Sequence, residues 1–328
     1  MKELEQIIER YEREHYLSGS MLITRHNKVL YEKSFGMASM QLHVPNTKHT
    51  KFHIASVTKM FIAAAILKYN EQGLLKLHDH PGQYVDELKE IDSGITIHHL
   101  LSHTSGLSDI YAVPHVRFEI SRLKLENGLF LPYLAGLKQL YKPGVKWHYS
   151  STGYIMMGYI LEKISGLTFE ETLSRLFFQP LGMKHTGVDN PIKINPGRAY
   201  GHTLEDGVYI HADHDKLAAV DAPGELYSTV GDLNLWCDSL LDGKVLSQQS
   251  MKSMLTPYAV TDFDPSLRYG YGWFIGSGFR LIGGGTHGFK SEIWQFPEQR
   301  LNVIMLWNYE KANSHNLFRA IRHLIVKF

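Results

Sequence analysis

The feature that most constrains the fold is a short polar motif, Ser-Val-Thr-Lys at residues 56–59, that runs directly into the apolar segment 60–67. Eight apolar residues in succession present no polar face, which is typical of a helix buried all round. Ser56 and Lys59 are three residues apart and so lie on one face of such a helix. The chain must therefore fold so that a serine and a lysine meet at the start of a buried helix.

This motif predicts a nucleophile and its base. Burial disfavours the charged form of an amine, so a neutral Lys59 could take a proton. A serine hydroxyl is a weak nucleophile until such a base lies beside it. The alternative is a chance match, because Ser-x-x-Lys occurs again at Ser121 and Lys124, in a charged stretch where a lysine would stay solvated. Whether the pattern at Ser56 is catalytic therefore depends on partner residues elsewhere in the chain.

Length and periodicity predict an α+β fold in two parts. A chain of 328 residues exceeds the usual limit for one core. Alternating segments near both ends predict an antiparallel β-sheet flanked by helices, and the middle of the chain is mainly helical. We expect residues 1–75 and 215–328 to form the sheet domain and 76–214 an inserted, mainly α-helical domain, with the active site at their interface.

Local signals predict the individual elements. Glycines and prolines mark helix stops and turns, and runs of β-branched and aromatic residues mark strands. The expected helices cover residues 3–15, 56 to about 73, 154–164 (closed by Gly166) and 314–326. The expected strands are two within 19–35, joined by a turn at His26 and Asn27, and then 269–275, 279–282, 292–296 and 301–307, with a turn at 297–300.

Bulk composition excludes several classes of function. The formal charge is +1 with no basic or acidic block, so we expect no binding to nucleic acid. No segment has the roughly 18 apolar residues that a transmembrane helix needs. The N-terminus has no signal region, which predicts a cytoplasmic protein as written, or an extracellular or periplasmic one if a leader was removed. The expected partner is a small-molecule or short-peptide substrate.

Nineteen histidines raise the alternative of a metal-dependent hydrolase. They cluster at His78 and His80 and again at His98, His99 and His103. Neither cluster has the spacing of a His-Glu-x-x-His helix or of a Cys/His zinc site. We therefore expect no metal and no cofactor.

Two further clusters could supply partners for Ser56. Tyr149 lies in the polar segment 147–153, and a tyrosine close to a lysine ammonium can act as base and then as acid. Its alternative role is to pack the loop onto the core. Glycines 283–285 would let a substrate approach a strand closely and would free an N–H for an oxyanion. Their alternative role is a simple turn or bulge.

These clusters together resemble the serine β-lactamase and penicillin-binding-protein-like family, in its class C, DD-peptidase and esterase branch. The resemblance follows the family's order of motifs from about residue 18 to the C-terminus. It is carried by the segments 53–59, 100–107, 143–154, 180–186 and 224–233 and by Gly288-Phe289-Lys290-Ser291.

The resemblance implies an acyl-enzyme mechanism. Ser56 would accept the acyl group, Lys59 would act as base or proton relay, and Tyr149 would protonate the leaving group. The oxyanion hole would be the N–H of Ser56 and one from the strand near Gly285. The residues that the resemblance assigns to oxyanion and substrate binding are Gly284, Gly285, Ser151 and His287.

Two departures from the family pattern favour a neutral ester or amide over a substrate that carries a carboxylate. Ser151 stands where the family usually has asparagine, and serine cannot offer an amide N–H. Ile282 stands where a lysine or histidine is expected, and His287 would face the other way along the strand. Two hypotheses follow: a working serine hydrolase, or a catalytically weakened relative that binds a ligand or partner in the cleft.

Overall fold

A computed structural model describes residues 2–113, 130–134, 136–190, 193–212 and 226–326. Its main sheet has eight strands in the order β10-β11-β12-β13-β14-β15-β1-β2, each antiparallel to its neighbour. The strands are β1 (Gly19–Arg25), β2 (Lys28–Phe35), β10 (Ala259–Val260), β11 (Arg268–Tyr269), β12 (Phe274–Gly276), β13 (Phe279–Thr286), β14 (Phe289–Phe296) and β15 (Leu301–Trp307). The α+β fold predicted from the sequence is confirmed.

The sheet joins the two ends of the chain. β1 pairs with β15, with Leu22 opposite Ile304, and with β2 on its other side. The turn between β1 and β2 is formed by His26 and Asn27, which have φ of 47° and 61°. This left-handed conformation is tolerated by Asn and His better than by bulkier residues. The predicted hairpin is thus confirmed, whereas the division of the chain at residues 75 and 215 stays a prediction.

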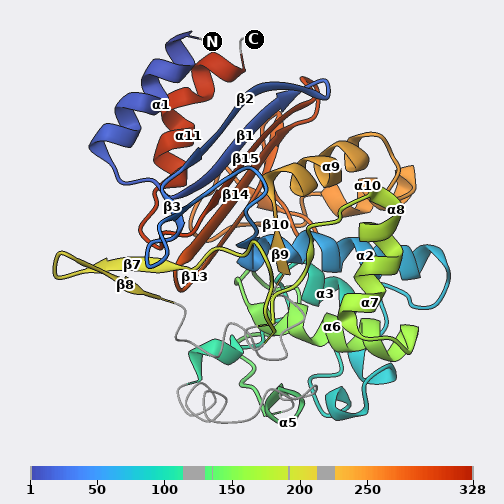
Figure 1. Ribbon diagram of the computed structural model, residues 1–328. Helices are drawn as coiled ribbons and strands as arrows, with labels where there is room; N and C mark the ends of the chain where they lie inside the picture. Colours follow the sequence, from blue (N-terminus) through green and yellow to red (C-terminus); the bar gives the residue numbers. More distant parts are fainter. Residues whose placement is uncertain (1, 114–129, 135, 191–192, 213–225, 327–328) are drawn as a thin grey trace.

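Helices cover both faces of the sheet (Figure 1). α1 (Lys2–Glu14) and α11 (Ser314–Ile325) pack together on one face, over a cluster that includes Met21 and Val303. α9 (Val230–Leu241) packs on β1 and β15 from the opposite face, over a cluster that includes Leu22 and Ile304. Side chains alternate between the two faces along a strand. Since helices cover both faces, the side chains of β1 and β15 are buried on both sides of the sheet.

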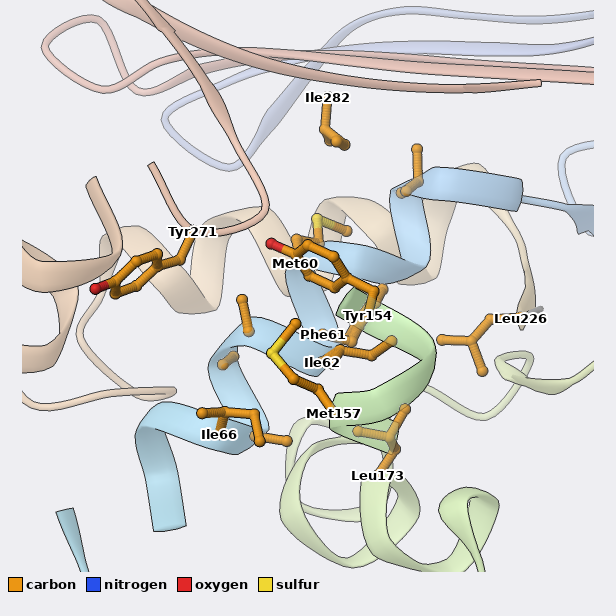
Figure 2. Close-up of a cluster of buried hydrophobic side chains, with 14 of the residues drawn as sticks. Met60, Phe61, Ile62, Ile66, Tyr154, Met157, Leu173, Leu226, Tyr271 and Ile282 are labelled. Atoms are coloured by element: carbon orange, nitrogen blue, oxygen red, sulfur yellow. The ribbon is translucent and has the colours of Figure 1, made fainter. Parts of the chain in front are cut away.

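The apolar segment after Ser56 forms α2 (Lys59–Glu71), which is buried from Lys59 to Leu67. It begins directly after a 3₁₀ turn, η1 (Ala55–Thr58), and a left-handed Gly73 follows it. α2 packs on α6 (Ser151–Ser165), which ends at a left-handed Gly166, and on α10 (Gln248–Leu255). Figure 2 shows the side chains of this helical layer close together beneath the sheet. These predicted helices are confirmed.

The prediction of one strand over residues 269–275 is wrong. β11 ends at Tyr269, β12 begins at Phe274, and Gly272 between them has φ of +73°. A Cβ on Gly272 would lie 2.8 Å from Cα of Met60, so the turn rests directly on the first turn of α2. Glycine therefore serves a close backbone approach that breaks the strand.

The remaining described elements are short. They connect the main sheet to the helical layer or lie at the surface, and the hairpin β7–β8 projects from the body (Figure 1). They are β3 (Met37–Ser39), β4 (Val44–Pro45), β5 (Phe52–His53), α3 (Ile97–Leu101), α5 (Leu131–Leu134), α7 (Phe169–Leu173), α8 (Gln179–Leu181), β6 (Gly187–Val188), β7 (His202–Glu205), β8 (Val208–His211) and β9 (Leu226–Ser228), with 3₁₀ turns at Pro81–Gln83, Asp86–Leu88 and Ile110–Ala112 and a π-helical turn at Ser174–Phe178. No helix within the described ranges is long and apolar enough to cross a membrane.

Candidate active site

Ser56 lies in η1, between the sheet and the buried helix α2. The preceding Ala55 has φ of +46°, a left-handed conformation that costs a residue with a Cβ roughly 1–2 kcal/mol. Neighbouring hydrogen bonds hold this turn: N–H of Ile54 donates to the carbonyl of Leu226, and Ser291 Oγ donates to the carbonyl of Ile54 at 2.7 Å. The fold thus fixes a half-buried serine in a strained turn at the start of a helix.

Lys59 meets Ser56 as the motif predicts. Its Nζ lies 3.1 Å from Ser56 Oγ and 3.5 Å from Ser151 Oγ. The same ammonium lies over the rings of Tyr149 and Tyr154, at 5.1 and 5.5 Å from their centroids. No ion pair of Lys59 with a carboxylate is found among the residues that the structure describes. The surroundings of the amine are hydroxyl groups and aromatic faces.

Tyr149 completes a three-residue cluster that joins two segments of the chain. Its hydroxyl donates to Ser56 Oγ at 2.7 Å from the loop before α6. Ser56 Oγ therefore has a phenol on one side and an amine on the other, both within hydrogen-bond distance. The predicted catalytic residues Ser56, Lys59 and Tyr149 are brought together by the fold, although their individual roles remain proposals.

His103 lies directly behind Tyr149, with ring centroids 4.5 Å apart. Its side chain is buried, and Nδ1 accepts the N–H of Ser150 at 3.3 Å. Burial, and secondarily the charge of Lys59, hold the pKa of His103 well below its usual range. The imidazole is therefore neutral at pH 7 and packs against the ring of Tyr149 at an interplanar angle of 40°.

Asp109 is a site residue that the sequence analysis missed. Its Oδ2 accepts the N–H of Ser151 at 2.8 Å, and its Oδ1 accepts the N–H of Tyr111 at 2.9 Å. The carboxylate thus lies at the N-terminus of α6, where the helix dipole favours a negative charge. It fixes the helix turn that presents Ser151 to Lys59. Only its position in the loop after the 100–107 motif could have drawn attention to it.

The glycine segment forms the other side of the site. Glycines 283–285 lie inside β13, paired with β14, and not in a terminal turn. A Cβ on Gly284 would lie 2.6 Å from the carbonyl oxygen of Ile54 and 2.7 Å from N of Ser56. Real Cβ atoms do not approach so closely, so glycine is required for β13 to contact the nucleophile turn. The simple-turn alternative for these glycines is wrong.

Ile282 contributes no polar group to the site. It is completely buried and packs into the helical cluster, where Figure 2 shows it between the sheet and the layer that contains Met60 and Tyr154. This position therefore supplies neither a cation nor an imidazole to the site. His287 lies at the exposed turn between β13 and β14, and its role in binding stays a prediction.

The other histidines have separate structural contacts. His98 Nδ1 lies 2.7 Å from Tyr271 Oη, and His99 forms a capping box with Thr96 at the start of α3. His80 Nδ1 accepts the N–H of Gly82. Within the described ranges, no three His, Cys, Asp or Glu side chains are grouped so that they could hold a metal ion. The second Ser-x-x-Lys, at Ser121 and Lys124, lies outside the described residues.

An antiparallel sheet with a helical layer, and a serine, lysine and tyrosine meeting between them, defines the serine β-lactamase and penicillin-binding-protein-like class. The chain belongs to the beta-lactamase family, whose model matches residues 4–326.

Relatives and solved structures agree with this assignment. Penicillin-binding protein 4* of Bacillus subtilis (strain 168) is 26% identical over 345 residues, which cover 99% of this chain and 76% of that protein. Putative penicillin-binding protein PbpX of the same strain is 29% identical, over 94% of this chain and 75% of the relative. The crystal structure of a penicillin-binding protein from Bacillus halodurans superposes with a TM-score of 0.87 at 27% identity and covers 98% of both chains.

Proposed function

We propose that the protein is a serine hydrolase that forms an acyl-enzyme on Ser56 with small ester, amide or peptide substrates. The observation that carries this proposal is the position of Ser56 Oγ, 2.7 Å from Tyr149 Oη and 3.1 Å from Lys59 Nζ. Two relatives are named penicillin-binding proteins, so β-lactams and D-amino-acid peptides belong to the substrates to be tested.

The proposed reaction begins with acylation. Ser56 Oγ attacks the substrate carbonyl carbon, and its proton passes to Lys59, which acts as the general base. The carbonyl oxygen becomes an oxyanion held by N–H of Ser56 and N–H of Gly285. As the tetrahedral intermediate collapses, the leaving group takes a proton from Tyr149, which regains one from Lys59. Water then attacks the ester carbonyl and passes a proton to Lys59. The bond to Ser56 Oγ breaks, the carboxylic acid leaves, and Ser56 Oγ takes that proton back.

The experiment is covalent labelling with a fluorophosphonate probe followed by peptide mass spectrometry. We expect a single adduct on Ser56 and none in Ser56→Ala. Tyr149→Phe is a matched variant that removes one hydroxyl, and it should label more slowly. Folded protein that gives no adduct would overturn the proposal.

A second candidate function is ligand binding without turnover. The observations that favour it are the burial of Ile282 and the long contact of 3.5 Å between Lys59 and Ser151, where a longer asparagine is usual. In this case a β-lactam or D-amino-acid peptide would raise the melting temperature equally in wild type and Ser56→Ala. Absence of labelling together with this shift would favour the binding function.

A further inference from the structure

His103 holds the backbone on both sides of Tyr149. Its carbonyl oxygen accepts the N–H of His148 at 2.9 Å, and its ring Nδ1 accepts the N–H of Ser150 at 3.3 Å. These two residues flank Tyr149 in the sequence. The imidazole also packs on the ring of Tyr149, with the centroids 4.5 Å apart. One residue therefore restrains the peptide before the tyrosine, the peptide after it and its aromatic ring.

The backbone of His103 is strained in a way that makes this double contact possible. Its φ is +57°, a left-handed conformation that is costly for a residue with a Cβ. The next residue is fixed on both sides, because N–H of Thr104 donates to the carbonyl of His99 and its own carbonyl accepts N–H of Gly144. Such strain persists only where the surroundings determine the conformation, and it is common at functional sites. The strained backbone turns both the carbonyl and the ring toward residues 148–150.

The contact with Ser150 needs an acceptor that an apolar side chain cannot supply. Ser150 is buried, its backbone is extended (φ −147°), and it lies directly before α6, so its N–H has no acceptor within the helix. Burial holds the pKa of His103 well below its usual range, so the ring is neutral and Nδ1 can accept. A leucine at residue 103 would fill the space but would remove the acceptor of this buried N–H.

The residues after Ser150 have anchors of their own. N–H of Ser151 donates to Asp109 Oδ2 at 2.8 Å, and Thr152 Oγ1 donates to the carbonyl of Ser108 at 2.9 Å. Loss of the imidazole would therefore free the backbone around Tyr149 and leave the first turn of α6 in place. Tyr149 Oη lies 2.7 Å from Ser56 Oγ, so its position matters directly for that contact.

We propose that His103 is the positioning residue of Tyr149 and acts through the two peptide groups that flank the tyrosine. By accepting an N–H on each side, it holds Tyr149 Oη at Ser56 Oγ, where the phenol protonates the leaving group. This inference rests on the proposed hydrolase function and deepens it. A displacement of about 1 Å at a catalytic group can reduce a rate roughly 10²-fold. His103 therefore contributes to the rate through the position of the tyrosine hydroxyl.

The test asks whether His103 still matters when Tyr149 has no hydroxyl. In His103→Leu, kcat/KM for phenyl acetate should fall roughly 10- to 100-fold, as expected for a displaced catalytic group. In Tyr149→Phe, which already lacks the hydroxyl, the further change His103→Leu should alter kcat/KM by no more than about twofold. The melting temperature of each variant checks the fold.

A second ester reports on the proton that Tyr149 delivers. The p-nitrophenolate of p-nitrophenyl acetate leaves more readily than the phenolate of phenyl acetate, so it depends less on an acid. The loss in His103→Leu should therefore be smaller for p-nitrophenyl acetate than for phenyl acetate, as in Tyr149→Phe. A loss of structure alone would reduce both values equally.

Matched variants separate the acceptor from the rest of the side chain. His103→Asn should keep most of the activity, because asparagine tolerates the left-handed backbone and its Oδ1 can accept the N–H of Ser150. If His103→Leu does not fold, His103→Gly takes its place, since glycine adopts this backbone without strain. The control is His98→Leu, which removes a half-buried ring and should leave kcat/KM within about twofold of wild type. The ring contacts of His98 are with His99, Tyr258 and Tyr271.

Three outcomes would overturn the inference alone. They are equal losses from His103→Leu in wild type and in Tyr149→Phe, a folded His103→Leu with wild-type activity, and a loss in His103→Asn as large as that in His103→Leu. If wild type hydrolyses neither ester and Ser56 is not labelled by the fluorophosphonate, the proposed function itself fails and the inference falls with it.

Discussion

Ser56 has two neighbours that could take its proton, Lys59 and Tyr149. Removing the amine of Lys59 tests which of the two is the base. Lys59 Nζ is 3.1 Å from Ser56 Oγ, and its other neighbours are Ser151 and the faces of two tyrosine rings. The amine thus lies within hydrogen-bond distance of the Ser56 hydroxyl and can take its proton directly. Tyr149 has the shorter contact with Ser56 but must lose a phenolic proton before it can act as base.

We therefore predict that Lys59→Met slows acylation of Ser56 by roughly 10²- to 10⁴-fold, the range for a general base. Methionine keeps the length of the side chain and removes the amine, so the buried start of α2 should remain packed. Stopped-flow labelling with an activated ester gives the acylation rate, and thermal unfolding checks the fold. A folded variant with a rate close to that of wild type would transfer the role of base to Tyr149.

Other residue-level features could not be predicted from the sequence. Asp109 acquires its role only through a partner 42 residues away along the chain, the N–H of Ser151. It belongs to no periodic pattern and to no spacing rule. His103 was noted only as one of a cluster of histidines, whereas the fold separates it from His98 and His99 and places it behind Tyr149.

At the scale of elements, prediction succeeded where local signals decide the structure. The buried helix α2, the hairpin β1–β2 and the helix α6 with its terminal Gly166 all follow from periodicity and stop signals. It failed at residues 269–275, where the strand is interrupted because Gly272 must rest on Met60. The only trace of such a contact in the sequence is the glycine itself. Glycine also occurs in strands for other reasons, such as bulges and bends, so the contact cannot be predicted from it.

The contact between β13 and η1 gives an element-level prediction with a matched control. Gly284→Ala would push the strand away from Ser56, because its Cβ would lie 2.6 Å from the carbonyl oxygen of Ile54. The neighbouring Gly283→Ala meets nothing closer than 3.6 Å. We expect kcat/KM to fall roughly 10²- to 10³-fold in Gly284→Ala, as when an oxyanion donor is displaced.

Gly283→Ala should stay within a few-fold of wild type. The measurement is steady-state hydrolysis of a p-nitrophenyl ester, with melting temperature as the check on folding. Similar activities in the two variants would show that the close approach of β13 to Ser56 is not needed for the reaction.

At the scale of the whole molecule, buried histidines make stability depend on pH. Burial is the main reason why the pKa values of His98 and His202 are lowered to about 4. Burial also holds the pKa of His103 well below its usual range. The unfolded chain takes up these protons near pH 6.5, whereas the folded chain does not. The unfolded state therefore binds more protons below pH 6.5, and the free energy of unfolding must fall as the pH falls from there to about 4.

His202 tests this linkage away from the site. His202 is the first residue of β7, and its side chain is buried. Its ring stacks on that of Tyr309, with the ring centroids 5.5 Å apart. Each proton taken up only by the unfolded state costs about 1.4 kcal/mol per pH unit. Between pH 6.5 and 5 we therefore expect wild type to lose about 2 kcal/mol more of unfolding free energy than His202→Asn.

Urea unfolding at pH 7, 6 and 5 measures the difference, and His323→Asn is the control because His323 is exposed on α11. The control should follow the wild-type curve, since an exposed imidazole has similar surroundings in both states. His202→Asn should be less stable than wild type at pH 7, where it loses packing, and should approach it at pH 5. If the curves of His202→Asn and wild type run parallel, His202 is protonated in the folded protein as readily as in the unfolded chain, and burial does not keep it neutral.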